Sequence, residues 1–379
     1  MTPKICVYTI CKNESKFVEK WLDSMQEADY ICVLDTGSTD DTYQKLKKDP
    51  RVTVVKKQII KPWRFDVARN ESMKLVPEDA DVLVCTDLDE IFDPGWADVI
   101  RKVWRPDATR IFYTFAWSHN SVGEPQDVFR YDKIHTRDYK WVYPIHEVLM
   151  PKDPNMHMLN LDVGTEIFLH HYPDKTKPRG FYFDLLKLSC EENPDDCHVQ
   201  MLYAREFLIN DRWEEGLQEF LKCLKMPDIE TPQKRLVLLN CLMQTALIYE
   251  KLNNFDETLW YCQEFIKEDK TYRDPYLLMG EVYNQMGMPT LAEACVKAAY
   301  EYAYQHRDWV ERSTTWLGWA HDVLSVAYFN VGKVDEAIRE GAEALKHEPN
   351  EPRLLKNMNL FLSEKIAQQE KLLNKGQNN

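Results

Sequence analysis

One pair of aspartates stands where it could hold a metal ion. Asp87 and Asp89 directly follow residues 81–85 (DVLVC), an apolar run that predicts a strand. Two carboxylates with one residue between them point to the same face of an extended segment, which suits a divalent cation bridging a diphosphate. The same spacing recurs at residues 79–81, before the strand. Because ligands of parallel sheets bind at the carboxyl ends of strands, only the pair after the strand is well placed.

Two further segments carry charge next to predicted strand or helix ends. Asp35 begins D-T-G-S-T-D after the apolar residues 30–34, so its carboxylate is expected to be free at a strand end. Arg64, Asp66 and Arg69 lie at a predicted helix start, where guanidinium groups and the helix terminus could meet a diphosphate. Taken singly, each segment also fits a plain reading, namely a strand-turn-helix connection, or a surface arginine beside a helix-capping aspartate.

The elements around these residues alternate between short apolar runs and amphipathic segments. The pattern predicts strands at residues 5–10, 30–34, 52–55 and 81–85, and helices at 15–25, 40–48 and 68–75. Continuous apolar strands bracketed by helices are typical of a buried, mostly parallel sheet. We therefore expect an α/β domain whose strand ends position the charged segments.

The second half of the chain predicts helix after helix. Trp213, Phe255, Leu291 and Val334 each open a predicted second helix of a hairpin, at spacings of 42, 36 and 43 residues. These are degenerate repeats of the tetratricopeptide kind, followed by a capping helix at residues 351–372. Prolines and a glycine in residues 172–180 separate the two patterns, so we expect an α/β domain at 1–176 and an all-α domain at 177–379.

Composition excludes some classes of protein. The chain has 379 residues and a net charge of −14. Residues 1–180 hold 26 basic and 29 acidic side chains, so most of the negative charge belongs to the repeats. An acidic repeat half repels phosphate backbones and argues against nucleic acid as a partner. The ten cysteines form no CxxC pair, and no apolar run has the length of a secretory signal or a membrane span, which predicts a cytoplasmic protein with free thiols.

Four motifs in order give the chain a family resemblance. The sequence K-N-E, D-T-G-S-T-D, A-R-N and D-L-D-E resembles family 2 glycosyltransferases of the GT-A fold. The layout of a short GT-A domain followed by tetratricopeptide repeats is similar to that of sublancin-type peptide S-glycosyltransferases. The motifs cover about residues 4–175, and the rest resembles the family by architecture alone.

The resemblance implies a role for each matching residue. A nucleotide sugar would be held by the end of the first strand and by the acidic motifs, and a cation, Mn²⁺ or Mg²⁺, by the last aspartate. The implied donor-binding residues are Thr9 and Glu14 for the nucleotide, Asp35 for the base, Arg69 near the diphosphate and Asp87 near the ribose, with Asp89 as metal ligand.

Two later segments complete the implied site. The run W-V-Y-P-I-H-E resembles the family's I-H-E segment and makes Glu147 the candidate base for the acceptor, with Asp138 as the second choice and a purely structural Glu147 as the alternative. The run F-L-H-H-Y makes His171 a candidate metal ligand, with His170 as the alternative. Pro173 follows where the family usually has glycine, so the loop there is expected to differ from that of relatives.

Together these features predict a metal-dependent, inverting glycosyltransferase of the hexosyltransferase class. Its donor would be a nucleotide sugar, which the family resemblance implies is UDP-linked. Its acceptor would be a hydroxyl or thiol on a peptide or protein held by the repeats. The alternative is an inactive scaffold that binds a nucleotide or a protein, against which the retained acidic residues argue. A nucleotidyltransferase is disfavoured because no glycine-rich basic loop precedes the first helix. The repeats could instead brace the catalytic domain or form a homodimer.

Overall fold

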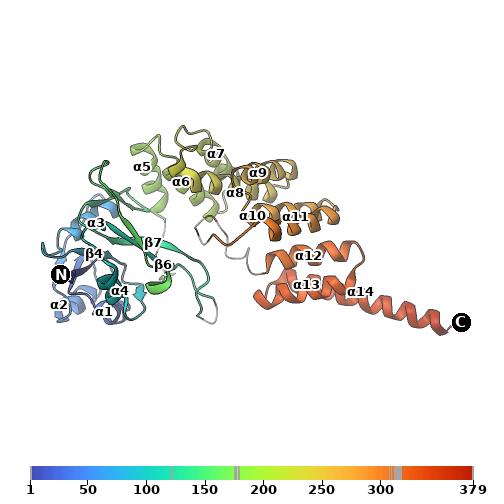
Figure 1. Ribbon diagram of the computed structural model, residues 1–379, viewed down its shortest axis with the longest axis horizontal. Helices are drawn as coiled ribbons and strands as arrows, with labels where there is room; N and C mark the ends of the chain where they lie inside the picture. Colours follow the sequence, from blue (N-terminus) through green and yellow to red (C-terminus); the bar gives the residue numbers. More distant parts are fainter. Residues whose placement is uncertain are drawn as a thin grey trace. The chain divides into compact units, whose positions relative to one another are not determined.

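The computed structural model describes residues 2–120, 123–174, 177, 180–306, 308, 310 and 318–377. The chain forms two compact units, Met1–Pro194 and Asp195–Asn379. The first unit is an α/β domain and the second consists of helices (Figure 1).

A mixed sheet is the framework of the first unit. Its strand order is β3-β2-β1-β4-β7-β6-β11-β5, with β10 beside β6, and β8 and β9 form a separate hairpin. Among the described residues, five of the eight pairings in the large sheet are parallel, as predicted. The strands are β1 (Ile5–Cys11), β2 (Tyr30–Asp35), β3 (Val54–Lys57), β4 (Val82–Cys85), β5 (Glu90–Phe92), β6 (Arg110–Ala116), β7 (Val128–His135), β8 (Tyr139–Val142), β9 (Val148–Pro151), β10 (Asn160–Asp162) and β11 (Phe168–His171).

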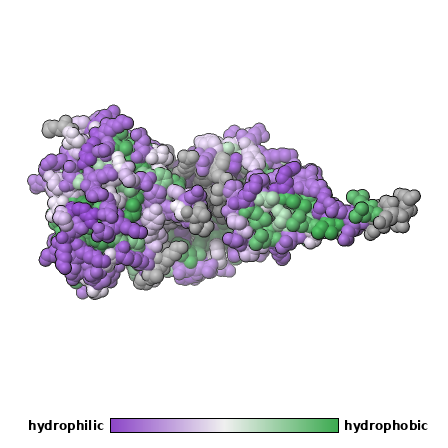
Figure 2. Space-filling view, turned by 90° about the horizontal axis from the view of Figure 1, so that it is seen from below, coloured by the Kyte–Doolittle hydropathy of each residue, from purple (hydrophilic) through white to green (hydrophobic). Residues whose placement is uncertain are grey.

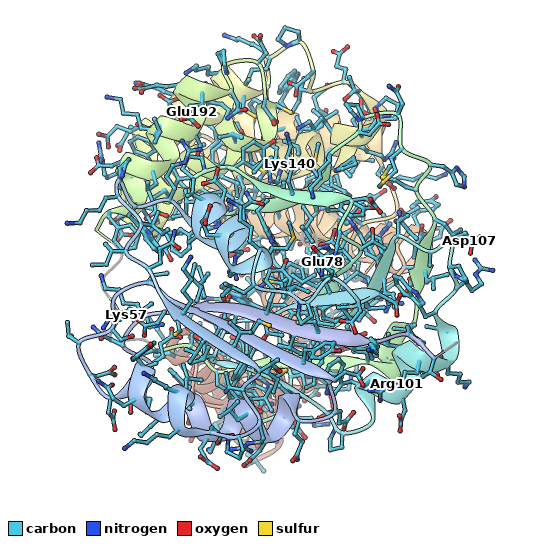
Figure 3. The ribbon with its side chains drawn as sticks, turned by 90° about the vertical axis from the view of Figure 1, so that its left-hand side faces the viewer. Lys57, Glu78, Arg101, Asp107, Lys140 and Glu192 are labelled. Atoms are coloured by element: carbon cyan, nitrogen blue, oxygen red, sulfur yellow. The ribbon has the colours of Figure 1, made fainter. Side chains whose placement is uncertain are left out.

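Helices and a hairpin cover the two faces of this sheet. The helices are α1 (Val18–Met25), α2 (Thr42–Lys48), α3 (Phe65–Met73), α4 (Trp96–Val103) and α5 (Tyr182–Glu192). Val7 of β1 packs with Trp21 of α1 on one face, whereas the next residue, Tyr8, packs with Trp141 of β8 on the other. Figure 3, in which Lys140 marks β8, shows α3 and β8 on the side of the sheet opposite α1 and α2. Strand β1 is buried on both faces, which explains its continuous apolar sequence.

A buried polar network joins the sheet to the hairpin. The indole N–H of Trp141 donates to Tyr8 Oη at 2.8 Å, and Tyr8 Oη lies 2.7 Å from Nε2 of His135. Nδ1 of His135 lies 2.6 Å from the carbonyl oxygen of Thr136. This geometry fits a neutral imidazole that donates through Nδ1 and accepts through Nε2. Burial lowers the pKa of His135 to about 3.

The buried His135 predicts a loss of stability in mild acid. Because an unfolded histidine titrates near pH 6.5, the unfolded chain binds one more proton than the folded chain between about pH 3 and pH 6.5. The free energy of unfolding should therefore fall with falling pH, by about 3 kcal/mol between pH 6.5 and pH 4 from this group alone. Urea unfolding at both pH values should show a smaller fall for His135→Gln than for the wild type. Equal falls in the two proteins would contradict the prediction.

Helix α5 belongs to the first unit. Arg64 at the start of α3 forms an ion pair with Glu192, the last residue of α5, and the ring of Phe65 stacks on that of Phe181. These contacts explain why the first compact unit extends to Pro194, whereas the change of sequence pattern placed the domain boundary at residue 176.

The described residues of the second unit form four helical hairpins and a final helix. The pairs are α6 (Cys197–Ile209) with α7 (Trp213–Cys223), α8 (Arg235–Lys251) with α9 (Phe255–Glu268), α10 (Asp274–Gln285) with α11 (Pro289–Tyr302), and α12 (Trp319–Asn330) with α13 (Val334–His347), followed by α14 (Pro352–Gln377). Three of the four second helices begin at the predicted residue. The exception is α11, which begins two residues before Leu291 because Pro289 suits the first position of a helix.

One turn conformation recurs in all four hairpins. The residue two positions before each second helix has a positive φ, between +55° and +79°, which ends the first helix with a left-handed cap. These residues are Asp211, Asn253, Gly287 and Gly332. Gly280 serves packing instead, because a Cβ there would lie 2.9 Å from Cγ1 of Val323 on the next first helix.

On the face drawn in Figure 2, most of the coloured residues are hydrophilic, and hydrophobic residues gather over the C-terminal helices. Helix α14 exposes Leu360, Ile366 and Leu372. Within the described residues, no helix has both the length and the apolar character needed to cross a membrane. All ten cysteines are free thiols, as the scattered spacing predicted.

Candidate functional site

The candidate site lies where the parallel strands β1, β2 and β4 end. Asp87 and Asp89 follow the last residue of β4 by two and four positions. The short strand β5 continues the chain and pairs antiparallel with β11, in a register that sets His171 opposite Glu90. The amide N–H of Tyr172 donates to the carbonyl of Asp89 at 2.8 Å and fixes the two segments together. This pairing brings the D-L-D motif and His171, 82 residues later in the sequence, to one place.

Asp89 and His171 lie close enough together to be two ligands of one cation. Nε2 of His171 lies 3.7 Å from Oδ2 of Asp89, and Nδ1 of His171 lies 3.1 Å from the carbonyl oxygen of Trp117. Two atoms that are each about 2.1 Å from a common Mg²⁺ can be at most about 4.2 Å apart, so a single ion can bridge this pair. The carbonyl of Trp117 orients the ring from behind, as partners of metal-binding histidines usually do.

The neighbouring His170 faces other groups. Its Nδ1 lies 2.9 Å from Nε2 of His119, and its Nε2 lies 3.3 Å from Oδ1 of Asp93. Because successive side chains of a strand point to opposite faces, only one of the two histidines can lie beside Asp89. The geometry therefore favours His171 over His170 as a ligand.

Asp87 is held by two basic side chains rather than left for a cation. Nη2 of Arg69 lies 2.9 Å from Oδ1 of Asp87, and Nζ of Lys133 lies 3.5 Å from Oδ2. Burial alone would raise the pKa of Asp87, but the charges of Arg69 and Lys133 outweigh it and hold that pKa well below its usual range. Lys133, on β7, also pairs with the buried Glu90 at 3.1 Å. Asp87 is thus a fixed carboxylate at every physiological pH.

The same arginine contacts the candidate base. Nε of Arg69 donates to Oε1 of Glu147, whose side chain is 11% exposed. The side-chain amide of Asn70 bonds both the N–H and the carbonyl of Trp141, at 3.0 and 2.8 Å, and so fixes β8 against α3. Glu147 follows β8 through a tight loop in which Tyr143 and His146 have φ values of +76° and +51°. Such backbone conformations are costly for residues with side chains and gather at functional sites.

The cluster also contains Glu14, an acid whose pKa is raised. Burial raises the pKa of Glu14 to about 7, against the opposing charge of Lys177, and the nearby Asp89 and Asp87 add to the rise. Nζ of Lys177 contacts Oε1 of Glu14. The cluster therefore combines acidic and basic side chains, several of which are buried.

Two predicted donor-binding residues lie in the neighbouring strands and make other contacts. Oδ1 of Asp35 accepts hydrogen bonds from the N–H groups of Gly37 and Ser38, at 2.9 and 2.8 Å. The expectation of a free carboxylate is wrong on this point, because one oxygen of Asp35 closes its own turn. Thr9 is buried within β1, and its hydroxyl donates to the carbonyl of Ile10 at 3.1 Å.

Asp138, the second choice for the base, lies elsewhere. It occupies the exposed turn between β7 and β8, where Oδ2 accepts a hydrogen bond from Thr136 at 2.8 Å. The end of β7 pairs with the beginning of β4, since His135 lies opposite Leu83. Asp138 is therefore at the amino-terminal edge of the parallel strands, away from the cluster.

Sequence reasoning missed three members of the cluster. Lys133 and Lys177 stand in no motif, and Glu90, the last residue of D-L-D-E, was given no role. A lysine near the end of a strand is ordinary in sequence, and only its 4% exposure shows that Lys133 is buried among acids. Glu90 directly follows D-L-D, which was the one signal available.

An α/β domain with this cluster, joined to helical hairpin repeats, defines the class of protein. The family model described as glycosyl transferase family 2 matches residues 6–210, more than half of the chain. The protein therefore belongs to glycosyltransferase family 2, as the order of its motifs predicted.

Solved structures resemble the helical part. They include MamA from Desulfovibrio magneticus RS-1, at 13% identity over 45% of this chain and 85% of that one, with a TM-score of 0.35. Another is TTC0263, a tetratricopeptide protein of Thermus thermophilus, at 22% identity over 48% of this chain and 88% of that one, with a TM-score of 0.34. A search of curated proteins finds no match to the chain.

Proposed function

We propose that this protein is a metal-dependent, inverting glycosyltransferase that moves a hexosyl group from a nucleotide sugar to a hydroxyl or thiol. The single observation that carries the proposal is the meeting of Asp89, His171, Asp87 and Arg69 at the strand ends of a family 2 domain. Membership of the family supports the reaction class, and the resemblance to the family is the reason for proposing UDP as the nucleotide.

The cluster separates the tasks of its two aspartates. Asp87 is neutralised by Arg69 and Lys133, whereas the ion pair that Asp89 forms among the described residues is with the imidazole of His171. Asp89 and His171 would hold Mn²⁺ or Mg²⁺, and the bound ion would supply charge neutralisation for the departing diphosphate. Carboxylate and imidazole together suit Mn²⁺ well, and water and phosphate oxygens would complete the coordination.

The basic side chains serve the donor. Arg69 and Lys133 point at the same carboxylate from α3 and β7, so they fix its direction without depending on a loop. Lys177 contacts Glu14 beside the two aspartates and lies within reach of a diphosphate oxygen once the donor displaces that contact.

Glu147 is the base in this proposal. An inverting displacement needs a group that takes the proton of the acceptor while the acceptor attacks the sugar. Glu147 is largely buried, lies beside Arg69 and follows a loop held by Asn70 and by the hydrogen bond from Phe65 N–H to the carbonyl of Pro144. The acceptor would be a peptide or protein, since stacked helical hairpins offer a concave surface to an extended chain.

The test is metal-dependent hydrolysis and binding of a panel of nucleotide sugars by the full chain. We expect at least one UDP-sugar to be hydrolysed slowly with Mn²⁺ or Mg²⁺ and not after EDTA, because water can replace the acceptor. Calorimetry with the same panel should show donor binding that requires the metal. The absence of both hydrolysis and metal-dependent binding for every nucleotide tested would overturn the proposal.

A further inference from the structure

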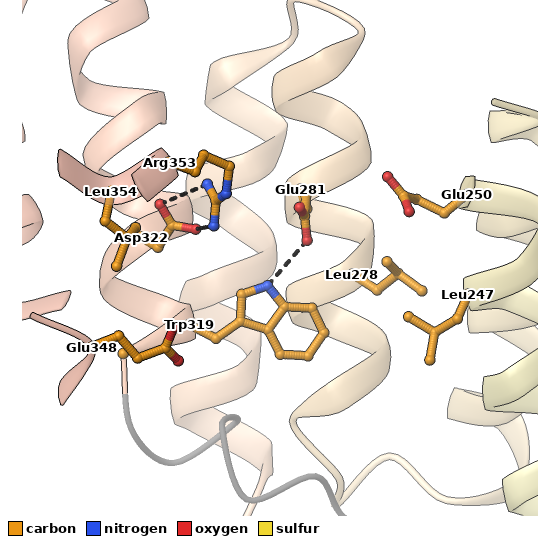
Figure 4. A pocket seen from close by; sticks show the side chains of 10 residues that line it. Leu247, Glu250, Leu278, Glu281, Trp319, Asp322, Glu348, Arg353 and Leu354 are labelled. Atoms are coloured by element: carbon orange, nitrogen blue, oxygen red, sulfur yellow. Dashed lines mark hydrogen bonds and ion pairs between the residues drawn. The ribbon is translucent and has the colours of Figure 1, made fainter. Parts of the chain in front are cut away.

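The second unit contains a pocket that the proposed transfer reaction does not use. It has a volume of about 340 Å³ and is lined by residues of α8, α10, α12 and α14 (Figure 4). Its lining residues are Leu247, Glu250, Leu278, Glu281, Gly318, Trp319, Asp322, Glu348, Arg353 and Leu354. Three of the four helices are the first helices of successive hairpins, so the repeats themselves build the pocket.

An apolar and an acidic residue recur at one spacing in these three helices. Leu247 and Glu250 on α8, Leu278 and Glu281 on α10, and Trp319 and Asp322 on α12 are each three positions apart. Residues at i and i+3 lie on the same face of a helix. Three neighbouring helices thus each turn one apolar side chain and one carboxylate toward the same cavity, and the pattern is more regular than a chance group of surface acids.

The charges of the lining do not balance. Four carboxylates face one guanidinium, and that guanidinium, of Arg353, is bound to both oxygens of Asp322 at 3.1 and 2.5 Å. Within the described part of the chain, no lysine, arginine or histidine forms an ion pair with Glu250, Glu281 or Glu348. Burial raises the pKa of Glu281, and the charge of Glu250 acts in the same direction. A cation placed among these carboxylates would relieve their mutual repulsion.

The other walls suit the stem of a basic side chain. The indole N–H of Trp319 donates to Oε2 of Glu281 at 3.1 Å, which fixes both groups at the cavity (Figure 4). Leu247, Leu278 and Leu354 supply apolar surface around the acids. Arginine and lysine side chains bury apolar stems while their charged ends bind carboxylates, and their cations are also attracted by indole rings.

We propose that this pocket binds the guanidinium or ammonium group of one arginine or lysine side chain on a polypeptide partner. Binding of the cation depends on the pocket alone. The further step, that the polypeptide is the sugar acceptor, rests on the proposed function.

The first experiment measures the cation directly. The full chain with ¹⁵N-labelled tryptophan is titrated with N-acetyl-arginine amide, N-acetyl-lysine amide and the neutral N-acetyl-citrulline amide, and Trp319→Phe identifies the indole signal of Trp319. We expect a saturable shift of that signal with the two cations and none with citrulline amide at the same concentrations. Glu281→Gln should weaken arginine amide binding about tenfold, and the exposed Glu214→Gln on α7 should leave it unchanged. No shift with either cation, or an equal shift with citrulline amide, would overturn the proposal.

A second titration identifies the source of the cation. The peptide Gly-Gly-Arg-Gly-Gly should bind at least as tightly as spermidine if the pocket serves a polypeptide, and tighter binding of spermidine would refute that assignment. Neither titration contains a nucleotide sugar. A protein that binds arginine amide but neither hydrolyses nor binds any donor with metal would therefore refute the proposed reaction and leave the pocket. A protein that hydrolyses a donor but binds neither cation would refute the pocket and leave the proposed reaction.

Discussion

Replacing Asp89 with alanine should abolish metal-dependent turnover, lowering kcat/KM for donor hydrolysis by about 10³-fold. Asp89 is the acidic residue of the cluster whose carboxylate faces His171 and is not neutralised by Arg69 or Lys133. Its loss removes the charged ligand and leaves a single imidazole, which holds Mg²⁺ or Mn²⁺ poorly. Calorimetric titration of Mn²⁺ in the presence of UDP should show the same loss, and circular dichroism should show an unchanged fold.

The chain contains its own control for this experiment. Asp79 belongs to the other D-x-D triplet, at the opposite end of β4, where it pairs with Lys4 and accepts a hydrogen bond from Tyr30. Asp79→Ala removes an exposed carboxylate of the same type and should change kcat/KM less than about twofold. Full activity of Asp89→Ala, or equal losses in both variants, would show that the motif at the strand end is not the metal site.

The fold followed from sequence because its signals are local. The starts of α7, α9 and α13 each follow a left-handed residue two positions earlier and open an amphipathic run, and the amphipathic run is visible in the sequence. The strands β1, β2 and β4 are buried on both faces, so their apolar runs were equally plain. Helix α5 was harder to place, because its packing on α3 depends on the contact of Arg64 with Glu192, 128 residues apart.

The cluster could be predicted only as far as its residues lie in motifs. Asp87, Asp89, Arg69 and Glu147 do so, and they meet in the structure. Lys133 comes from β7, and its approach to Asp87 depends on the antiparallel pairing of β7 with β4, which no local pattern encodes. The distinction between His170 and His171 likewise depends on the register of β11 against β5. Nonlocal strand pairing is thus what the sequence alone left open.

Glu147→Gln should lower kcat for transfer to the acceptor by about 10²- to 10⁴-fold while leaving the KM for the donor nearly unchanged. The amide oxygen of glutamine can still accept the hydrogen bond from Nε of Arg69, so the variant removes the base and keeps the contact. Asp138→Asn is the matched control, because the exposed turn of Asp138 lies at the other edge of the sheet, and its kcat should be unchanged.

The separate changes in kcat and in the KM for the donor distinguish a base from a structural partner. If Glu147 only positions Arg69, glutamine would keep that contact without its charge, so kcat would change little and the effect would be confined to a rise in the KM for the donor. Donor hydrolysis by water gives a further measure, since slow hydrolysis depends less on a base that is aligned with the acceptor. Loss of transfer with retained donor binding in Glu147→Gln, together with full activity of Asp138→Asn, would assign the proton transfer to the loop that joins β8 to β9. Because that loop contains Tyr143 and His146, both with positive φ, the same result would account for its strained backbone.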